Sequence, residues 1–94
     1  MATNKTTGDI GVGTTTINDG VAIVAGINIV AAAADVTVTL YDNTAGSGKI
    51  VAKYILDIDV AGLSAYVDLP DVRCEIGLTA VVAGVGAEVI VHYR

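Results

Sequence analysis

The 94-residue sequence contains no tryptophan and no phenylalanine, and it has a single cysteine and a single proline. One cysteine cannot form a disulfide within the chain, so no disulfide framework holds this small fold together. That usage is typical of a reducing compartment, or of a chain that its partners stabilise. Since aromatic residues make up only 4%, the core must come from valine, alanine and isoleucine, whose small or β-branched side chains suit pleated sheets.

Basic residues are also scarce. Lys and Arg number 5 against 10 Asp and Glu, which gives a formal net charge of −5. Five scattered cations cannot supply the basic patch on which affinity for nucleic-acid phosphates depends, so we expect no nucleic-acid partner. The hydrophobic fraction of 53% and the charged fraction of 16% exclude intrinsic disorder, which requires the opposite balance.

Long hydrophobic runs are absent as well. The longest, residues 21–34, is interrupted by Asn28 and is shorter than the roughly 20 residues that cross a bilayer. The first residues lead into a stretch of Thr and Gly and not into the apolar segment of a signal peptide. We therefore expect a soluble protein with no membrane partner.

Two segments differ in composition. Residues 1–20 are rich in Thr, Gly, Asn and Asp, which predicts an extended N-terminal arm, and residues 21–94 form the predicted β-sandwich domain. Within the arm, a run of β-prone residues is suited to pairing with the edge of a neighbouring sheet. These predicted interface residues are Thr14, Thr15, Thr16 and Ile17.

From residue 21 onward, apolar and polar residues alternate with the period of a β-strand. A turn-rich segment, 42–48, joins strands predicted at 35–42 and 49–57 into a hairpin. A second hairpin is expected at the C-terminus, around Gly84 and Gly86. Earlier in the chain, the strand that precedes Pro70 is expected to end at this proline. The sequence thus predicts an all-β fold, a small antiparallel β-sandwich or jelly roll of six to eight short strands with the extended N-terminal arm.

Signatures of catalysis, cofactor binding and metal binding fail on inspection. Gly48 and Lys49 resemble the end of a phosphate-binding loop, but the first glycine and the following Ser or Thr are missing, and a strand follows instead of a helix. Cys74 lies in phase with apolar neighbours and is interpreted as a buried hydrophobe, not as a nucleophile activated by His92. One Cys and one His are too few for zinc, and no stretch has the spacing of a calcium loop. We expect no enzyme activity, no catalytic residue, no cofactor and no metal.

Several strands are apolar on both faces, although a sandwich of this size has a single interior. Strands covered on both faces usually have this composition, and large exposed apolar patches mark interaction surfaces. We therefore expect the chain to form a homo-oligomer or to bind a larger assembly. The further predicted interface residues are Val51, Ile55 and Ile90.

Three segments resemble small structural proteins of tailed bacteriophages. They are residues 36–49 (VTVTLYDNTAGSGK), 72–82 (VRCEIGLTAVV) and 87–94 (AEVIVHYR). The resemblance implies a β-sandwich present in many copies on the virion, a capsid decoration (cement) protein on the capsid surface that is made in the cytoplasm of the host bacterium. Its implied partner is the major capsid protein, whose assembled shell it stabilises across capsomer boundaries.

One alternative remains open at this point. The alternative function is that of a tail or head-fibre module that recognises a host-surface glycan or another virion protein. Glycan platforms usually use exposed aromatic rings, for which Tyr41 and Tyr66 are the outward-facing candidates.

Overall fold

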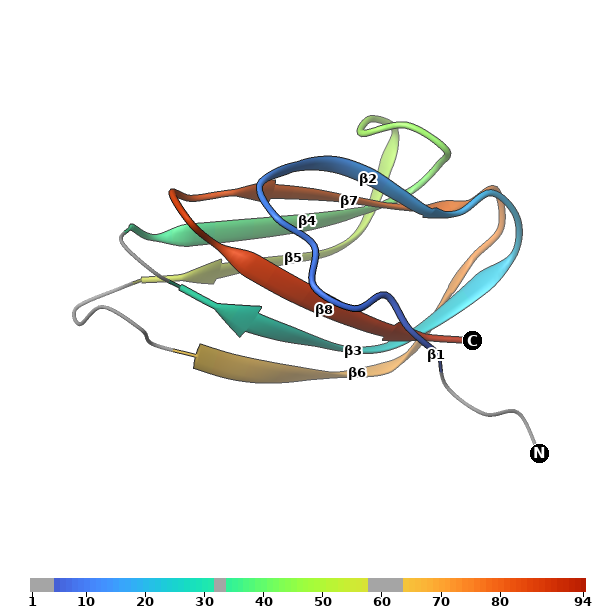
Figure 1. Cartoon of the computed structure of the whole chain (residues 1–94). Coiled ribbons are helices and arrows are strands. Elements are labelled where there is room, and N and C mark those ends of the chain that lie inside the picture. The colour runs from blue at the N-terminus through green and yellow to red at the C-terminus, as the bar shows by residue number, and fades with distance from the viewer. Residues whose placement is uncertain (1–4, 32–33, 58–63) are drawn as a thin grey trace.

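The computed structural model describes residues 5–31, 34–57 and 64–94. These residues form eight strands in two four-stranded antiparallel sheets that pack face to face (Figure 1). The strands are β1 (Lys5–Thr6), β2 (Gly13–Asn18), β3 (Ala22–Val30), β4 (Val36–Asp42), β5 (Lys49–Leu56), β6 (Ser64–Cys74), β7 (Leu78–Ala83) and β8 (Glu88–Tyr93). The predicted all-β sandwich is confirmed.

The strand order identifies the topology. Sheet A has the order β1-β8-β3-β6 and sheet B the order β2-β7-β4-β5. Along the described chain, every consecutive pair except β4 and β5 changes sheet. This is the arrangement of an eight-stranded jelly roll, in which two sheets share one interior.

The core lies between the two sheets and consists almost entirely of aliphatic side chains. Strands that pack on one face bury every second residue, and this period is clear in β4, β7 and β8. The largest fully buried side chains are Val24, Ile27, Ile29, Val36, Val38, Leu40, Leu78, Val82, Val89 and Val91, together with Thr79 and Cys74. The interior is therefore filled without any large aromatic ring.

The hairpin predicted from the turn-rich segment is confirmed. β4 pairs with β5 from Val36 opposite Leu56 to Asp42 opposite Lys49. The register shifts between Leu40 and Tyr41, which leaves Val51 as an extra residue on β5. A β-bulge of this kind bends the edge strand and explains why β5 does not follow a simple alternation of buried and exposed residues.

A second bulge exchanges the inward and outward faces of β3 partway along the strand. Ile23, Ala25, Ile27 and Ile29 have the spacing of one strand face, yet the fully buried residues are Ala22 and Val24 before the bulge and Ile27 and Ile29 after it. The register of β3 shifts between Val24 and Gly26 against both of its neighbours. One extra residue exchanges the two faces of a strand, because the side-chain period is two.

Pro70 does not end its strand, contrary to the expectation from the sequence. β6 continues through Pro70 to Cys74, and Asp71 has a φ of 50° within the strand. This irregular stretch lies opposite the bulge of β3. The proline is tolerated because β6 is an edge strand, where a missing N–H need not interrupt the ladder.

The predicted C-terminal hairpin is wrong. β7 and β8 are consecutive, but they belong to different sheets, so residues 84–87 form an arch across the sandwich. Gly84 has a φ of 129°, and its carbonyl accepts a hydrogen bond from the Ala87 N–H at 3.1 Å. Short Gly-rich connections suit hairpins and arches alike, and burial of both strands against the shared core selects the arch.

The described part of the predicted N-terminal arm lies along one side of the sandwich. β1 pairs with β8 in sheet A, and β2 pairs with β7 in sheet B. Ile10, between them, is buried in the core and bridges Val89. Residues 5–18 thus supply one edge strand to each sheet, because Ile10 and Ile17 pack on the shared interior.

We expect Gly84→Ala to lower the free energy of unfolding by roughly 1–3 kcal/mol, the usual cost of a strained backbone conformation. A Cβ at this position would lie 2.6 Å from the Asp35 carbonyl oxygen, and its φ disfavours any other residue. Urea unfolding followed by circular dichroism measures the change. Val85→Ala, at the adjacent exposed position, is the control and should change stability by less than about 0.5 kcal/mol.

We expect Ile10→Ala to lower the free energy of unfolding by about 2–5 kcal/mol, because it leaves a cavity in the shared core. Val12→Ala, two residues away and 57% exposed, should have little effect. Thermal and urea unfolding of the two variants compare them directly. Equal stability of the two variants would show that residues 5–18 are a dispensable arm.

Candidate functional site

The structure does not bring the predicted interface residues together. Thr14, Thr15 and Thr16 are exposed on β2, and Ile17 is half-buried there against the core. Val51 and Ile55 lie on β5, the opposite edge of sheet B, where Val51 packs on the core and Ile55 is 57% exposed. Ile90 is half-buried on β8 in the other sheet. These residues therefore mark three separate surfaces, which are the β2 edge of sheet B, the β5 edge of sheet B and the outer face of sheet A.

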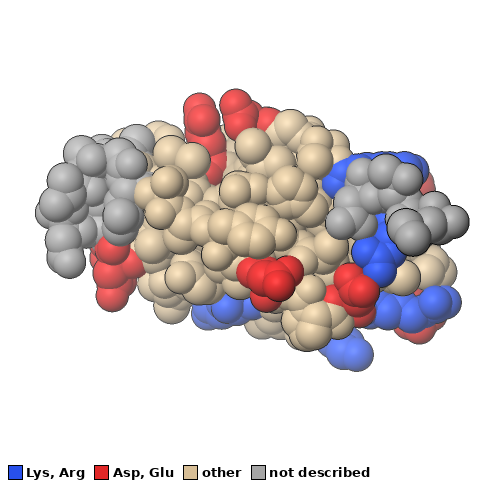
Figure 2. Space-filling model, turned by 90° about the horizontal axis from the view of Figure 1, so that it is seen from below, with Lys and Arg blue, Asp and Glu red and all other residues tan. Residues whose placement is uncertain are grey.

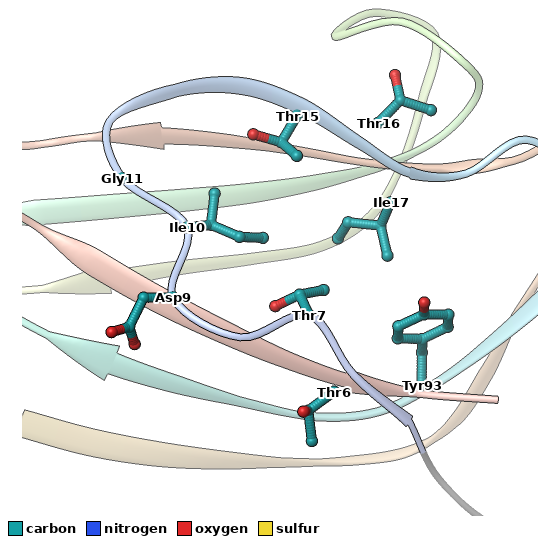
Figure 3. A pocket seen from close by; sticks show the side chains of 9 residues that line it. All are labelled: Thr6, Thr7, Asp9, Ile10, Gly11, Thr15, Thr16, Ile17 and Tyr93. Atoms are coloured by element: carbon teal, nitrogen blue, oxygen red, sulfur yellow. The ribbon is translucent and has the colours of Figure 1, made fainter.

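The first surface is an open pocket of about 440 Å³ at the edge where β1 and β2 are the outermost strands. Ile10, Thr15, Ile17 and Tyr93 converge on its space, whereas Thr16 points away (Figure 3). The Thr7 hydroxyl is already engaged, since it donates to the Gly8 carbonyl and accepts the Val91 N–H. The pocket is an open depression in which polar groups outweigh apolar surface, lined by Thr6, Thr7, Asp9, Ile10, Gly11, Thr15, Thr16, Ile17 and Tyr93.

The second surface is the outer face of sheet A. Cross-strand register places Asn28 between Ile90 on β8 and Tyr66 on β6. The flanking rows contain Val30 between Glu88 and Ser64, and Gly26 between His92 and Asp68. We call these nine residues the sheet-A face: Gly26, Asn28, Val30, Ser64, Tyr66, Asp68, Glu88, Ile90 and His92. Uncharged side chains cover most of the middle of this side of the molecule, while Lys and Arg gather toward one end (Figure 2).

An aromatic and polar cluster organises the sheet-A face. The Tyr66 side chain lies across Gly26, where a Cβ would clash with the tyrosine hydroxyl oxygen. The Tyr66 and His92 rings meet edge to face with centroids 5.8 Å apart, and the His92 Nε2 is hydrogen-bonded to the Asn28 side-chain oxygen. Tyr66 is nevertheless 56% exposed. The cluster thus holds the Tyr66 ring in place and leaves it exposed on this face.

Sequence reasoning singled out Tyr66 and Ile90 separately and missed Asn28 between them. The signal was available, because Asn28 interrupts an apolar run and lies between two buried isoleucines. A polar residue in that phase marks the outward face of a half-buried strand. Tyr41, the other aromatic candidate, is only half-exposed and lies on sheet B.

Cys74 and His92 do not form a catalytic pair. Cys74 is fully buried at the end of β6, whereas His92 belongs to the outer cluster with Tyr66 and Asn28. Burial, assisted by the nearby charge of Asp42, raises the pKa of the Cys74 thiol. A raised pKa disfavours the thiolate that a nucleophile requires, so Cys74 acts as a packed side chain.

Metal ligands are not gathered in the described parts of the chain. No group of three or more His, Cys, Asp and Glu side chains occurs there. Of the closely spaced carboxylates Asp57 and Asp59, Asp57 is exposed and Asp59 lies outside the described residues. Within those same ranges, no helix has the length and apolar character of a membrane span.

A buried carboxylate organises the loops at one end of the sandwich. The Asp42 Oδ1 accepts the N–H groups of Ile76 at 2.8 Å and Gly77 at 3.3 Å, and its Oδ2 accepts that of Glu75 at 3.0 Å. These bonds, led by those from Glu75 and Ile76, lower the pKa of Asp42 despite the opposing effect of burial. Asp42 is thus a structural clamp between the β4 end and the β6–β7 connection.

No protein-family model, curated protein or solved structure matches this chain. The candidate surfaces therefore rest on the geometry described above.

We expect the stability that Asp42 provides to depend on pH. Its folded pKa lies below the unfolded value, so protonation favours unfolding, and the contribution present above about pH 4 is lost as the pH falls through the folded pKa. Asp42→Asn removes this contribution. The variant should melt at a lower temperature than the unaltered chain at pH 6, and the difference should shrink toward pH 3.

Thermal unfolding of both proteins between pH 6 and pH 2.5 measures the effect. Asp68→Asn, which changes an exposed carboxylate on β6, is the matched control and should melt in parallel with the unaltered chain. A melting difference for Asp42→Asn that stays constant down to pH 2.5 would contradict the clamp.

Proposed function

We propose that this chain is a non-enzymatic structural protein of a tailed-bacteriophage virion. In this proposal it is a capsid decoration (cement) protein that binds the assembled head and stabilises it across capsomer boundaries. The resemblance of residues 36–49, 72–82 and 87–94 to small phage structural proteins supports it. So does the jelly-roll topology, which recurs in viral capsid domains and presents two broad sheet faces on a rigid scaffold.

The observation that carries the proposal is the sheet-A face. Its centre combines the half-buried Ile90 and the exposed Val30 and Tyr66 on three adjacent strands, with the two carboxylates of Asp68 and Glu88 at the rim. An uncharged centre, an aromatic anchor and a polar rim are the composition of protein interfaces. We infer that this face lies against the major capsid protein.

Binding to the assembled head, and not to free subunits, would stabilise the shell by mass action. A small domain with a flat docking face meets this requirement, because each copy can span neighbouring subunits without rearrangement. The described residues gather no metal-binding group on this face. The interaction is therefore one of surface complementarity.

Co-sedimentation of purified protein with shells stripped of accessory proteins tests the proposal. We expect saturable binding at a fixed ratio to the major capsid protein. Val30→Lys and Tyr66→Ala should each weaken binding about tenfold or more, because central anchors dominate interface energies. Ile55→Lys, on the outermost strand of sheet B, is the matched control and should bind like the unaltered chain.

Shell binding that survives both sheet-A variants would overturn the docking face. No binding of the unaltered chain would overturn decoration itself and favour the second candidate, a tail or head-fibre module. The exposed Tyr66 ring beside the Asn28 amide is the observation that favours glycan recognition in that case. Glycan binding that is lost in Tyr66→Ala would support that function.

A further inference from the structure

The four outermost strands of the described sheets differ in how they are protected against pairing with another chain. β1 has two residues, too few for an extended ladder. β5 carries Lys49 and Lys53, and β6 carries Pro70 and the irregular Asp71. Shortness, lysines, prolines and bulges are the devices by which natural sheets prevent edge-to-edge association.

β2 has none of these protections over most of its length. Its six residues, Gly13–Asn18, contain no charge and no proline, and its pairing with β7 is regular until the shift between Thr16 and Asn18. The first four residues are exposed, and β2 is the last strand of sheet B in the described chain. An extended, uncharged edge of this kind is suited to adding another strand.

The pocket lies at this same edge. Thr15 and Ile17 line it from β2, and Ile10 and Tyr93 line it from the opposite side (Figure 3). Ile17 packs on the core but stays partly exposed, so the interior of the sandwich is incompletely closed here. A strand laid along β2 would cover this opening and bury apolar surface as well as form backbone hydrogen bonds.

We propose that the partner at this edge is a second copy of the same chain, with β2 pairing antiparallel to β2 about a two-fold axis. The pairing makes one continuous eight-stranded sheet from the two sheets B. An isologous contact requires a surface that is complementary to itself, and an uncharged Thr-rich strand meets that condition. Thr residues facing one another across antiparallel strands form favourable pairs.

Charge opposes a second copy less at this edge than elsewhere on the surface. The chain carries a net charge of −5, so two copies repel one another over most of their surfaces. β2 contributes no charge, and of the residues lining the adjacent pocket Asp9 alone is charged. Self-association through this edge therefore brings little like charge together. This inference goes beyond capsid binding, which uses the sheet-A face on the other sheet.

Sedimentation equilibrium of the purified chain over a range of concentrations tests the proposal. We expect a reversible monomer–dimer equilibrium. Thr14→Glu and Thr14→Lys each place like charges near one another across the two-fold axis and should raise the dimer dissociation constant tenfold or more. An equimolar mixture of the two variants should restore dimers, because opposite charges then meet.

The matched controls are Ser64→Glu and Ser64→Lys, which add the same charges to β6, the outermost strand on the far side of sheet A. These controls should dimerise like the unaltered chain. A monomer at every concentration, charge variants that dimerise normally, or a mixture that stays monomeric would each overturn the proposal. These outcomes are independent of shell binding, so the two proposals fail separately.

Hydrogen exchange on the unaltered chain provides a second measurement that no folding defect can obscure. Amides of β2 should exchange more slowly as protein concentration rises, because a second strand occupies their free edge. Amides of β5, which is protected by lysines, should not respond. Protection of β2 that is independent of concentration would contradict the two-fold pairing.

Discussion

The structure depends on the packing of small aliphatic side chains between two sheets that share one interior. Without phenylalanine or tryptophan, the space between the sheets is filled by Val, Ile, Leu and Ala from nearly every strand. Each strand must therefore direct apolar side chains into the core at all of its inward positions. Because side chains alternate between the two faces, each inward position also sets the direction of the adjacent residues in its strand. The close-packed interior leaves little tolerance for a change of volume at any single position.

Bulges reconcile this constraint with the actual order of residues. At Ala25 the inward set on β3 changes from even to odd positions, which brings Ile27 and Ile29 into the core. The same shift turns Gly26 and Asn28 outward. There Gly26 lies beneath the Tyr66 side chain, and the Asn28 side chain is hydrogen-bonded to His92. One extra residue in a central strand thus builds both the core and the sheet-A face. The proposed docking face thus follows from a packing requirement.

Much of the fold could be predicted from the sequence because alternation is a local signal. The β4–β5 hairpin follows from a concentrated turn signal between two alternating segments, and Cys74 was correctly interpreted as buried. Register is not local. The bulge at Ala25, the passage of β6 through Pro70 and the arch at Gly84 all depend on which strand lies alongside, and short sequence windows carry no such information.

The candidate surfaces were predicted less well for the same reason. Exposure of Ile55 and the β-prone character of Thr14–Thr16 follow from composition, but their separation onto opposite edges of sheet B depends on topology. The row of Ile90, Asn28 and Tyr66 joins three strands that are distant in sequence. Asp42 was interpreted as a turn residue, and its three backbone partners lie more than thirty residues away.

Charged side chains are unevenly distributed over the surface. Arg73 and Arg94 are each paired with a carboxylate, and Lys49 and Lys53 lie on β5. The centre of the sheet-A face is uncharged, and so is strand β2. A domain of this size buries a modest fraction of its surface, so the proposed contacts with partners would add appreciably to its stability. In the two proposals, an uncharged face and an uncharged edge let a thin aliphatic sandwich gain that stability in two directions, along a shell and between copies.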